Sequence, residues 1–172
     1  EQLMDLDSGF LMYIQEFMRN DAATRTFRGI TTLGNAGAVW IAISLLLLVP
    51  KKTRRIGCMG LLALVLSLLF NNMLLKHLIA RSRPYDCIRG LIPLITPPTD
   101  YSFPSGHTAA SFAVGVLLFR KLPKRYGIPA LVLAALIGFS RLYLGVHYPT
   151  DVLTGFVIAL VGSCLLYTSD AA

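Results

Sequence analysis

The chain has 172 residues, of which 55% are hydrophobic and only 15% are charged. The charges form short clusters between long apolar runs, a distribution typical of a membrane protein. The formal net charge of +7 could indicate nucleic acid, but basic residues between spanning segments more often set loop orientation or bind anionic head groups, so we expect no nucleic-acid partner. The length fits a single membrane-embedded domain over residues 1–172.

The N-terminal segment, residues 1–29, begins with apolar residues at helical spacing between Leu3 and Met18. The acidic residues Asp5, Asp7 and Glu16 interrupt this pattern. Because carboxylates are costly in hydrocarbon, a first spanning helix is the weaker alternative. We therefore expect an amphipathic helix that lies on the membrane surface.

Five apolar segments within residues 30–167 are expected to cross the membrane as helices. Each approaches the roughly 20 residues needed to cross about 30 Å of hydrocarbon, although the third and fifth are short. Their ranges are 30–49, 56–75, 104–119, 128–144 and 152–167. The predicted fold is all-α: an integral membrane helical bundle of about five transmembrane helices plus the N-terminal interfacial helix.

Two short loops, 51–55 and 120–125, carry clusters of Lys and Arg. With five crossings both loops lie on one side of the membrane, and the positive-inside rule makes that side the cytoplasm. The loops 76–103 and 145–150 then lie together on the outer side. The sequence thus predicts an extracytoplasmic site, and we expect the membrane to be a bacterial plasma membrane.

Basic residues suited to an anion belong to the segments that meet on this outer face. Lys76 offers a compact charge, and Arg83 and Arg141 offer planar forks. Together they suit a tetrahedral oxyanion that carries more than one charge. A single such side chain is more often one that extends to the membrane interface, but the neighbouring histidines favour an anion site.

Ser105 and Gly106 directly precede an apolar helical run. Their backbone N–H groups would face outward at a helix N-terminus, where the partial positive charge favours an anion. Gly106 would also let the backbone approach a phosphate closely. An ordinary helix cap at Ser105 is the alternative reading, and the two are compatible.

His147 and Asp151 are four residues apart around Pro149, which suits a first helical turn. The carboxylate could hold one ring nitrogen, leave the other free to attack and stabilise the positive charge that develops. Asp151 could instead simply place negative charge at a helix N-terminus. His107 could protonate the departing oxygen from the opposite side.

In chain order these segments read K-x6-R-P, P-S-G-H and S-R-x5-H-x3-D. The chain therefore resembles the type 2 phosphatidic acid phosphatase superfamily, which includes the vanadium-dependent haloperoxidases. The resemblance implies a nucleophilic His147 oriented by Asp151, a general acid at His107 and a phosphohistidine intermediate that water hydrolyses. It assigns phosphate binding to Lys76, Arg83, Ser105, Gly106 and Arg141. It also implies no metal or other cofactor, and no carboxylate cluster suited to magnesium lies near these motifs.

Several functions stay open within this resemblance. The substrate could be a lipid diphosphate such as undecaprenyl diphosphate, or phosphatidic acid or phosphatidylglycerophosphate, and family analogy favours the diphosphate. Membrane spans around the site favour a lipid over a halide. A non-catalytic lipid-binding protein would lack at least one of His107, His147 and Asp151, and all are present.

Membrane members of the family commonly have six spanning helices, so the predicted count leaves the N-terminal topology open. The sequence leaves protein partners open.

Overall fold

The computed structural model of the protein describes residues 2–171; the side chains of Leu3 and of residues 165–171 lie outside that description. Helices form all of the regular secondary structure in the described part of the chain, so the predicted all-α class is confirmed. The elements are α1 (Gln2–Tyr13), η1 (Ile14–Met18), α2 (Asp21–Leu33), η2 (Asn35–Gly37), α3 (Ala38–Leu48), α4 (Arg54–Ser67), η3 (Leu68–Leu75), α5 (Lys76–Ile79), α6 (Pro84–Cys87), α7 (Gly106–Lys121), α8 (Lys124–Tyr143) and α9 (Pro149–Ala171).

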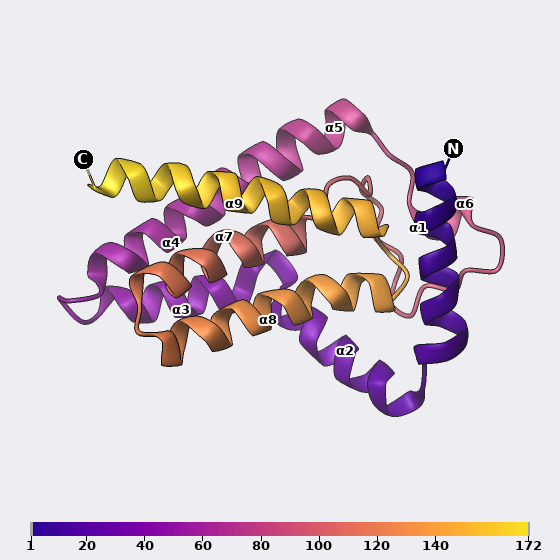
Figure 1. Ribbon diagram of the computed structural model, residues 1–172, viewed down its shortest axis with the longest axis horizontal. Coiled ribbons are helices and arrows are strands. Elements are labelled where there is room, and N and C mark those ends of the chain that lie inside the picture. The colour runs from indigo at the N-terminus through magenta and orange to yellow at the C-terminus, as the bar shows by residue number, and fades with distance from the viewer. Residues whose placement is uncertain (1, 172) are drawn as a thin grey trace.

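The helices α3, α4, α7, α8 and α9 run along the long axis of the molecule, and α1 lies across one end (Figure 1). Small residues on facing helices let the backbones approach closely: a Cβ on Gly115 would lie 3.2 Å from Cβ of Ala134. The fully buried Trp40 donates its indole N–H to Ser111 Oγ at 2.9 Å, which joins α3 to α7. Close packing and one satisfied polar contact thus hold α7 at the centre of the bundle.

Among the described residues, two segments are long and apolar enough to cross a membrane, Arg54–Cys87 and α8. The pair α2 and α3 would be a third, although its two halves are bent by 48°. The first predicted span therefore differs from the structure, because α2 already begins at Asp21 and the chain turns at η2, where Ala36 and Gly37 have positive φ. The helix α9 is apolar over Pro149–Cys164, and the number of crossings stays a prediction.

The long helices turn large apolar side chains outward, as expected for a bundle solvated by lipid tails. Leu46 is 70% exposed, and Val65 and Val157 are more than half exposed. The surface of α1 follows the same rule, with Leu6 exposed and Asp7 buried. A membrane-surface position of α1 stays a prediction, but burial of Asp7 shows that its acidic residues do not all face water.

The two ends of the bundle differ. The loops between α3 and α4 and between α7 and α8, which carry the basic clusters, lie at the end opposite to α1 (Figure 1). The segments that join α5 to α7 and α8 to α9 lie at the end where α1 crosses. The two basic loops therefore share one end of the bundle and all three motifs belong to the α1 end, while the side of the membrane on which each end lies stays a prediction.

Candidate active site

One cavity of about 1040 Å³ brings together six of the eight predicted site residues. They are Lys76, Arg83, Gly106, His107, Arg141 and His147. The remaining two, Ser105 and Asp151, are fully buried and are bonded to groups beside the cavity. The predicted convergence of the three segments is thus present in the structure.

His147 lies in the loop between α8 and α9, and each of its ring nitrogens has a partner. Nη1 of Arg83 lies 3.1 Å from Nε2, and Oδ2 of Asp151 lies 3.4 Å from Nδ1. Because a guanidinium can only donate, Nε2 must be the acceptor and the proton sits on Nδ1, facing the carboxylate. The lone pair of Nε2 therefore points toward Arg83, on the side of the phosphate-binding cations, and attack requires that a bound anion take over this donor.

Burial lowers the pKa of His147 to about 3, and the charges of Arg83 and Arg141 act in the same direction while Asp151 opposes them. The imidazole is therefore neutral at physiological pH. A neutral ring with an unprotonated Nε2 is the form that a nucleophile requires.

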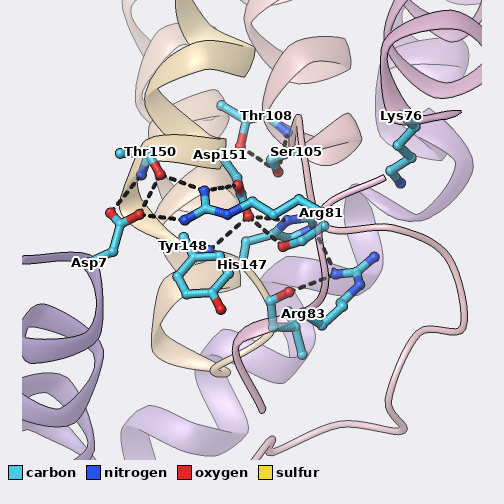
Figure 2. Close-up of polar contacts among 12 residues, drawn as sticks. Asp7, Lys76, Arg81, Arg83, Ser105, Thr108, His147, Tyr148, Thr150 and Asp151 are labelled. Carbon is cyan, nitrogen blue, oxygen red and sulfur yellow. Dashed lines mark hydrogen bonds and ion pairs between the residues drawn. The ribbon is translucent and has the colours of Figure 1, made fainter. Parts of the chain in front are cut away.

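Asp151, in the first turn of α9, is held by several donors. Ser102 Oγ and the backbone N–H of Tyr148 donate to Oδ2 at 2.5 and 2.9 Å, and Arg81 Nη1 donates to Oδ1 at 2.7 Å (Figure 2). α9 begins at Pro149, as the sequence predicted. The carboxylate cannot rotate without losing these bonds, so it fixes the orientation of the His147 ring.

The three predicted cations face the cavity in different ways. Lys76, at the end of the π-helical stretch η3, forms a close ion pair with Asp100, and Arg83 Nη2 donates to Asp100 Oδ1 at 2.6 Å. Arg141 donates through Nη1 to Thr31 Oγ1 at 2.9 Å, and no described residue accepts from its buried Nε. A buried donor without a protein acceptor is suited to an incoming anion.

Asp100 was not among the predicted residues. Burial alone would raise its pKa, but the hydrogen bonds and charges of Lys76 and Arg83 lower it to about 2, so it is ionised at neutral pH. Its carboxylate therefore leaves two of the three positive charges uncompensated. An anion that binds here must share or displace this carboxylate.

We expect Asp100→Asn to bind vanadate about tenfold more tightly than the wild type, because one negative charge next to the bound anion is removed. The measurement is inhibition of phosphate release by vanadate. Asp86→Asn, which removes a carboxylate from the neighbouring helix α6, serves as the control. Weaker vanadate inhibition in Asp100→Asn would show instead that Asp100 mainly holds the cations in place.

Ser105 and Gly106 begin α7, as predicted, but they do not both present free N–H groups. The N–H of Ser105 donates to the backbone oxygen of Asp151 at 3.1 Å, and its hydroxyl accepts from Thr108 as a helix cap. The expected outward N–H at Ser105 is therefore wrong, because the start of α9 packs directly against the start of α7. A Cβ on Gly106 would lie 2.5 Å from Oδ1 of Asn72, so a larger residue here would displace the Asn72 side chain.

The bend between α2 and α3 brings polar groups to the site. Asn35 Oδ1 lies 3.0 Å from Nε2 of His107, and Thr31 bonds Arg141 as described. A straight first helix would not place Asn35 against the α7 terminus. The bend thus explains both the broken first span and the fixed orientation of His107.

Sequence reasoning missed Asp7, Arg81 and Asp100. Arg81 occupies a variable position of the K-x6-R-P segment, and Asp100 lies in an irregular loop without helical spacing to any partner. Their common signal is a charged residue in or near an otherwise apolar, membrane-associated segment, which is a functional indication by itself.

Comparisons with known proteins identify the family. Residues 57–171 match the PAP2 superfamily. An undecaprenyl-diphosphatase from Sulfolobus acidocaldarius is 36% identical over 131 residues, covering 76% of this chain and 62% of that protein. Undecaprenyl-diphosphatase BcrC from Bacillus subtilis is 34% identical over 114 residues, covering 64% of this chain and 54% of that protein. The chain thus spans less than two thirds of the length of these two relatives.

A solved structure of the PAP2 type has a similar fold over nearly the whole chain. The crystal structure of a transmembrane PAP2 type phosphatidylglycerolphosphate phosphatase from Bacillus subtilis superposes with a TM-score of 0.81 at 30% identity, covering 99% of this chain and 87% of that one. The fold, the family match over more than half of the residues and the three motifs around one cavity agree: the chain belongs to the PAP2 superfamily.

Proposed function

We propose that the protein is a membrane lipid phosphatase that removes the terminal phosphate of a lipid diphosphate of the undecaprenyl type through a phosphohistidine intermediate on His147. The observation that carries this proposal is the Nε2 lone pair of His147, which faces a cavity lined by Lys76, Arg83 and Arg141. A positioned nucleophile and a cationic oxyanion site are the two parts that phosphoryl transfer requires.

In the first step the terminal phosphate binds among Lys76, Arg83 and Arg141. The Nε2 lone pair of His147 attacks phosphorus, an N–P bond forms and the bond to the leaving oxygen breaks. The imidazole becomes positively charged, and Asp151 stabilises that charge through Nδ1–H. His107, which lines the same cavity and is protonated in the substrate complex, donates this proton to the leaving oxygen and becomes neutral.

In the second step a water molecule attacks phosphorus and the N–P bond breaks. His107, deprotonated by the first step, accepts the proton of that water, which returns both histidines to their starting forms. The products are inorganic phosphate and a lipid shortened by one phosphate group. The side chains of Lys76, Arg83 and Arg141 neutralise the charge of the phosphoryl group throughout both steps. We therefore expect activity to persist in excess chelator.

The shape of the cavity supports a lipid substrate. Its polar residues lie near the ends of η3, α7 and α8, whereas Ile41 of α3 and Leu61 and Val65 of α4 line it on the apolar side. Ile41 and Val65 are also exposed on the outer surface of the bundle. An apolar chain could therefore leave the phosphate site between α3 and α4 and remain in the hydrocarbon.

The position of the basic loops supports an extracytoplasmic active site. Loops 51–55 and 120–125 lie at the end of the bundle opposite to α1 and the motifs (Figure 1). If the positive-inside rule places these loops in the cytoplasm, the phosphate site opens at the outer surface, at the depth of the lipid head groups.

The substrate preference follows from the leaving group. A departing monophosphate needs less protonation by His107 than a departing alkoxide does. We therefore expect a long-chain prenyl diphosphate to have at least about tenfold higher kcat/KM than phosphatidic acid or phosphatidylglycerophosphate in the same detergent micelles. The measurement is phosphate release from this panel, with excess chelator present. A clear preference for phosphatidylglycerophosphate would contradict the diphosphate assignment and leave the histidine mechanism intact.

A further inference from the structure

A carboxylate from the N-terminal helix is built into the site. Asp7 of α1 is only 3% exposed, although its helix lies at the edge of the bundle (Figure 1). Its Oδ1 accepts the backbone N–H of Thr150 at 3.1 Å, and its Oδ2 accepts the Thr150 hydroxyl at 2.5 Å (Figure 2). Thr150 belongs to the first turn of α9, the same turn that carries Asp151. Asp7 thus caps the start of α9 from a helix more than 140 residues away in the sequence.

Arg81 connects Asp7 to Asp151. Its Nη2 donates to Asp7 Oδ2 at 2.9 Å, and its Nη1 donates to Asp151 Oδ1 at 2.7 Å and to Thr150 Oγ1 at 2.7 Å. The guanidinium also stacks on the ring of Tyr148, 3.8 Å from its centroid. Figure 2 shows the guanidinium between the two carboxylates. A planar group fixed on both edges and one face has little freedom to turn.

The two oxygens of the Asp151 carboxylate bind different partners. Oδ1 is bonded by Arg81, so Oδ2 is turned to Nδ1 of His147. An arginine next to Asp151 would by itself neutralise the negative charge that supports the histidine. Asp7 offsets the charge of Arg81, so the group of Asp7, Arg81 and Asp151 keeps one net negative charge for the imidazolium that forms during attack.

We propose that Asp7 is a positioning residue for the His147–Asp151 pair and acts through Arg81 and Thr150, so that α1 completes the active site. This inference rests on the proposed function, since it concerns the same nucleophile. Asp7 touches neither the substrate nor the reacting atoms. Its effect is to hold Asp151 in place and to preserve its charge.

The direct test is Asp7→Asn, which keeps the size of the side chain and one acceptor for Thr150 but removes the charge that faces Arg81. The matched control is Asp5→Asn, which removes the same charge from an exposed position on the same helix. Phosphate release gives kcat and KM, and bound vanadate per protein counts the folded sites. We expect kcat per site to fall about ten- to hundredfold in Asp7→Asn, the usual range for a residue that orients a functional group, with KM within about twofold. Asp5→Asn should match the wild type.

A second set of variants tests whether Asp7 acts through Arg81. Arg81→Gln should lower kcat at least as much as Asp7→Asn, and Arg81→Lys should restore part of the loss because it keeps the charge. Asp7→Asn added to Arg81→Gln should have little further effect, since the partner is already gone. If the double variant instead lost kcat by the product of the two single losses, the proposed route through Arg81 would be overturned.

The outcomes separate this inference from the proposed function. If the wild type releases phosphate and Asp7→Asn retains wild-type kcat per vanadate-binding site, the positioning role is overturned while the phosphatase proposal stands. If Asp7→Asn loses only vanadate-binding sites, with unchanged kcat per site, Asp7 serves folding alone and the inference is also overturned. If the wild type releases no phosphate from any lipid of the panel, the proposed function fails, and this inference fails with it.

Discussion

His147→Ala is expected to lose turnover by at least about 10⁴-fold, the order of loss that follows removal of a covalent nucleophile. Among the described residues, no other side chain at the cavity combines an unprotonated ring nitrogen that faces the cations with a carboxylate on its second nitrogen. The cations remain, so the variant should still bind phosphate. The measurement is phosphate release per vanadate- or phosphate-binding site.

His77→Ala is the matched control for this variant. His77 is an exposed histidine next to Lys76, and its Nδ1 lies 3.0 Å from the backbone oxygen of Met73 rather than at the cavity. It should keep wild-type turnover. Substantial turnover by His147→Ala would show that another group forms the bond to phosphorus.

His107→Ala is expected to slow the steady-state rate by about 10²- to 10⁴-fold, the usual contribution of a general acid and base. The loss should depend on the leaving group. An aryl phosphate, whose phenolate leaves without protonation, should still phosphorylate His147, whereas hydrolysis of the intermediate should lack its base. Rapid mixing should therefore show a burst of phenol equal to the number of sites, followed by slow turnover.

The wild type provides the comparison for that burst. With His107 present, both steps should be fast, and a smaller burst or none should precede steady state. Loss of the burst in His107→Ala would mean that this residue is needed for the first step even with a good leaving group. Asn35→Ala removes the partner of His107 Nε2. It should therefore also show a burst followed by slower turnover, with a smaller loss of rate than His107→Ala.

The sequence predicted the parts of the site that depend on local spacing. The interval between His147 and Asp151 is set by one helical turn that begins at Pro149, so their contact could be foreseen. The cap at Ser105 likewise depends only on residues that follow it directly. The convergence of three segments followed from the alternation of apolar spans and from the family motifs.

The remaining features depend on contacts between distant segments. Asp100 reaches Lys76 and Arg83 from an irregular loop, and Asp7 reaches Arg81 from another helix. Neither pairing has a sequence spacing that could reveal it. The N–H of Ser105 was assigned to an anion because nothing local shows that the Asp151 carbonyl lies within 3.1 Å. The bend at Asn35–Gly37 does have a local signal, because the sequence Gly34-Asn35-Ala36-Gly37 is typical of a turn, and the predicted span over residues 30–49 ran through it.

The central claim, that His147 carries the phosphoryl group, is tested most directly by isolating the intermediate. His107→Ala is mixed with substrate labelled with ³²P in the terminal phosphate, quenched in alkali and digested, and the labelled peptide is sequenced. We predict close to one labelled phosphoryl group per vanadate-binding site, stable in alkali, labile in acid, located on His147 and absent from the double variant that also carries His147→Ala. Label on any other residue, or phosphate release at wild-type rate with no labelled protein at any time, would contradict the proposal.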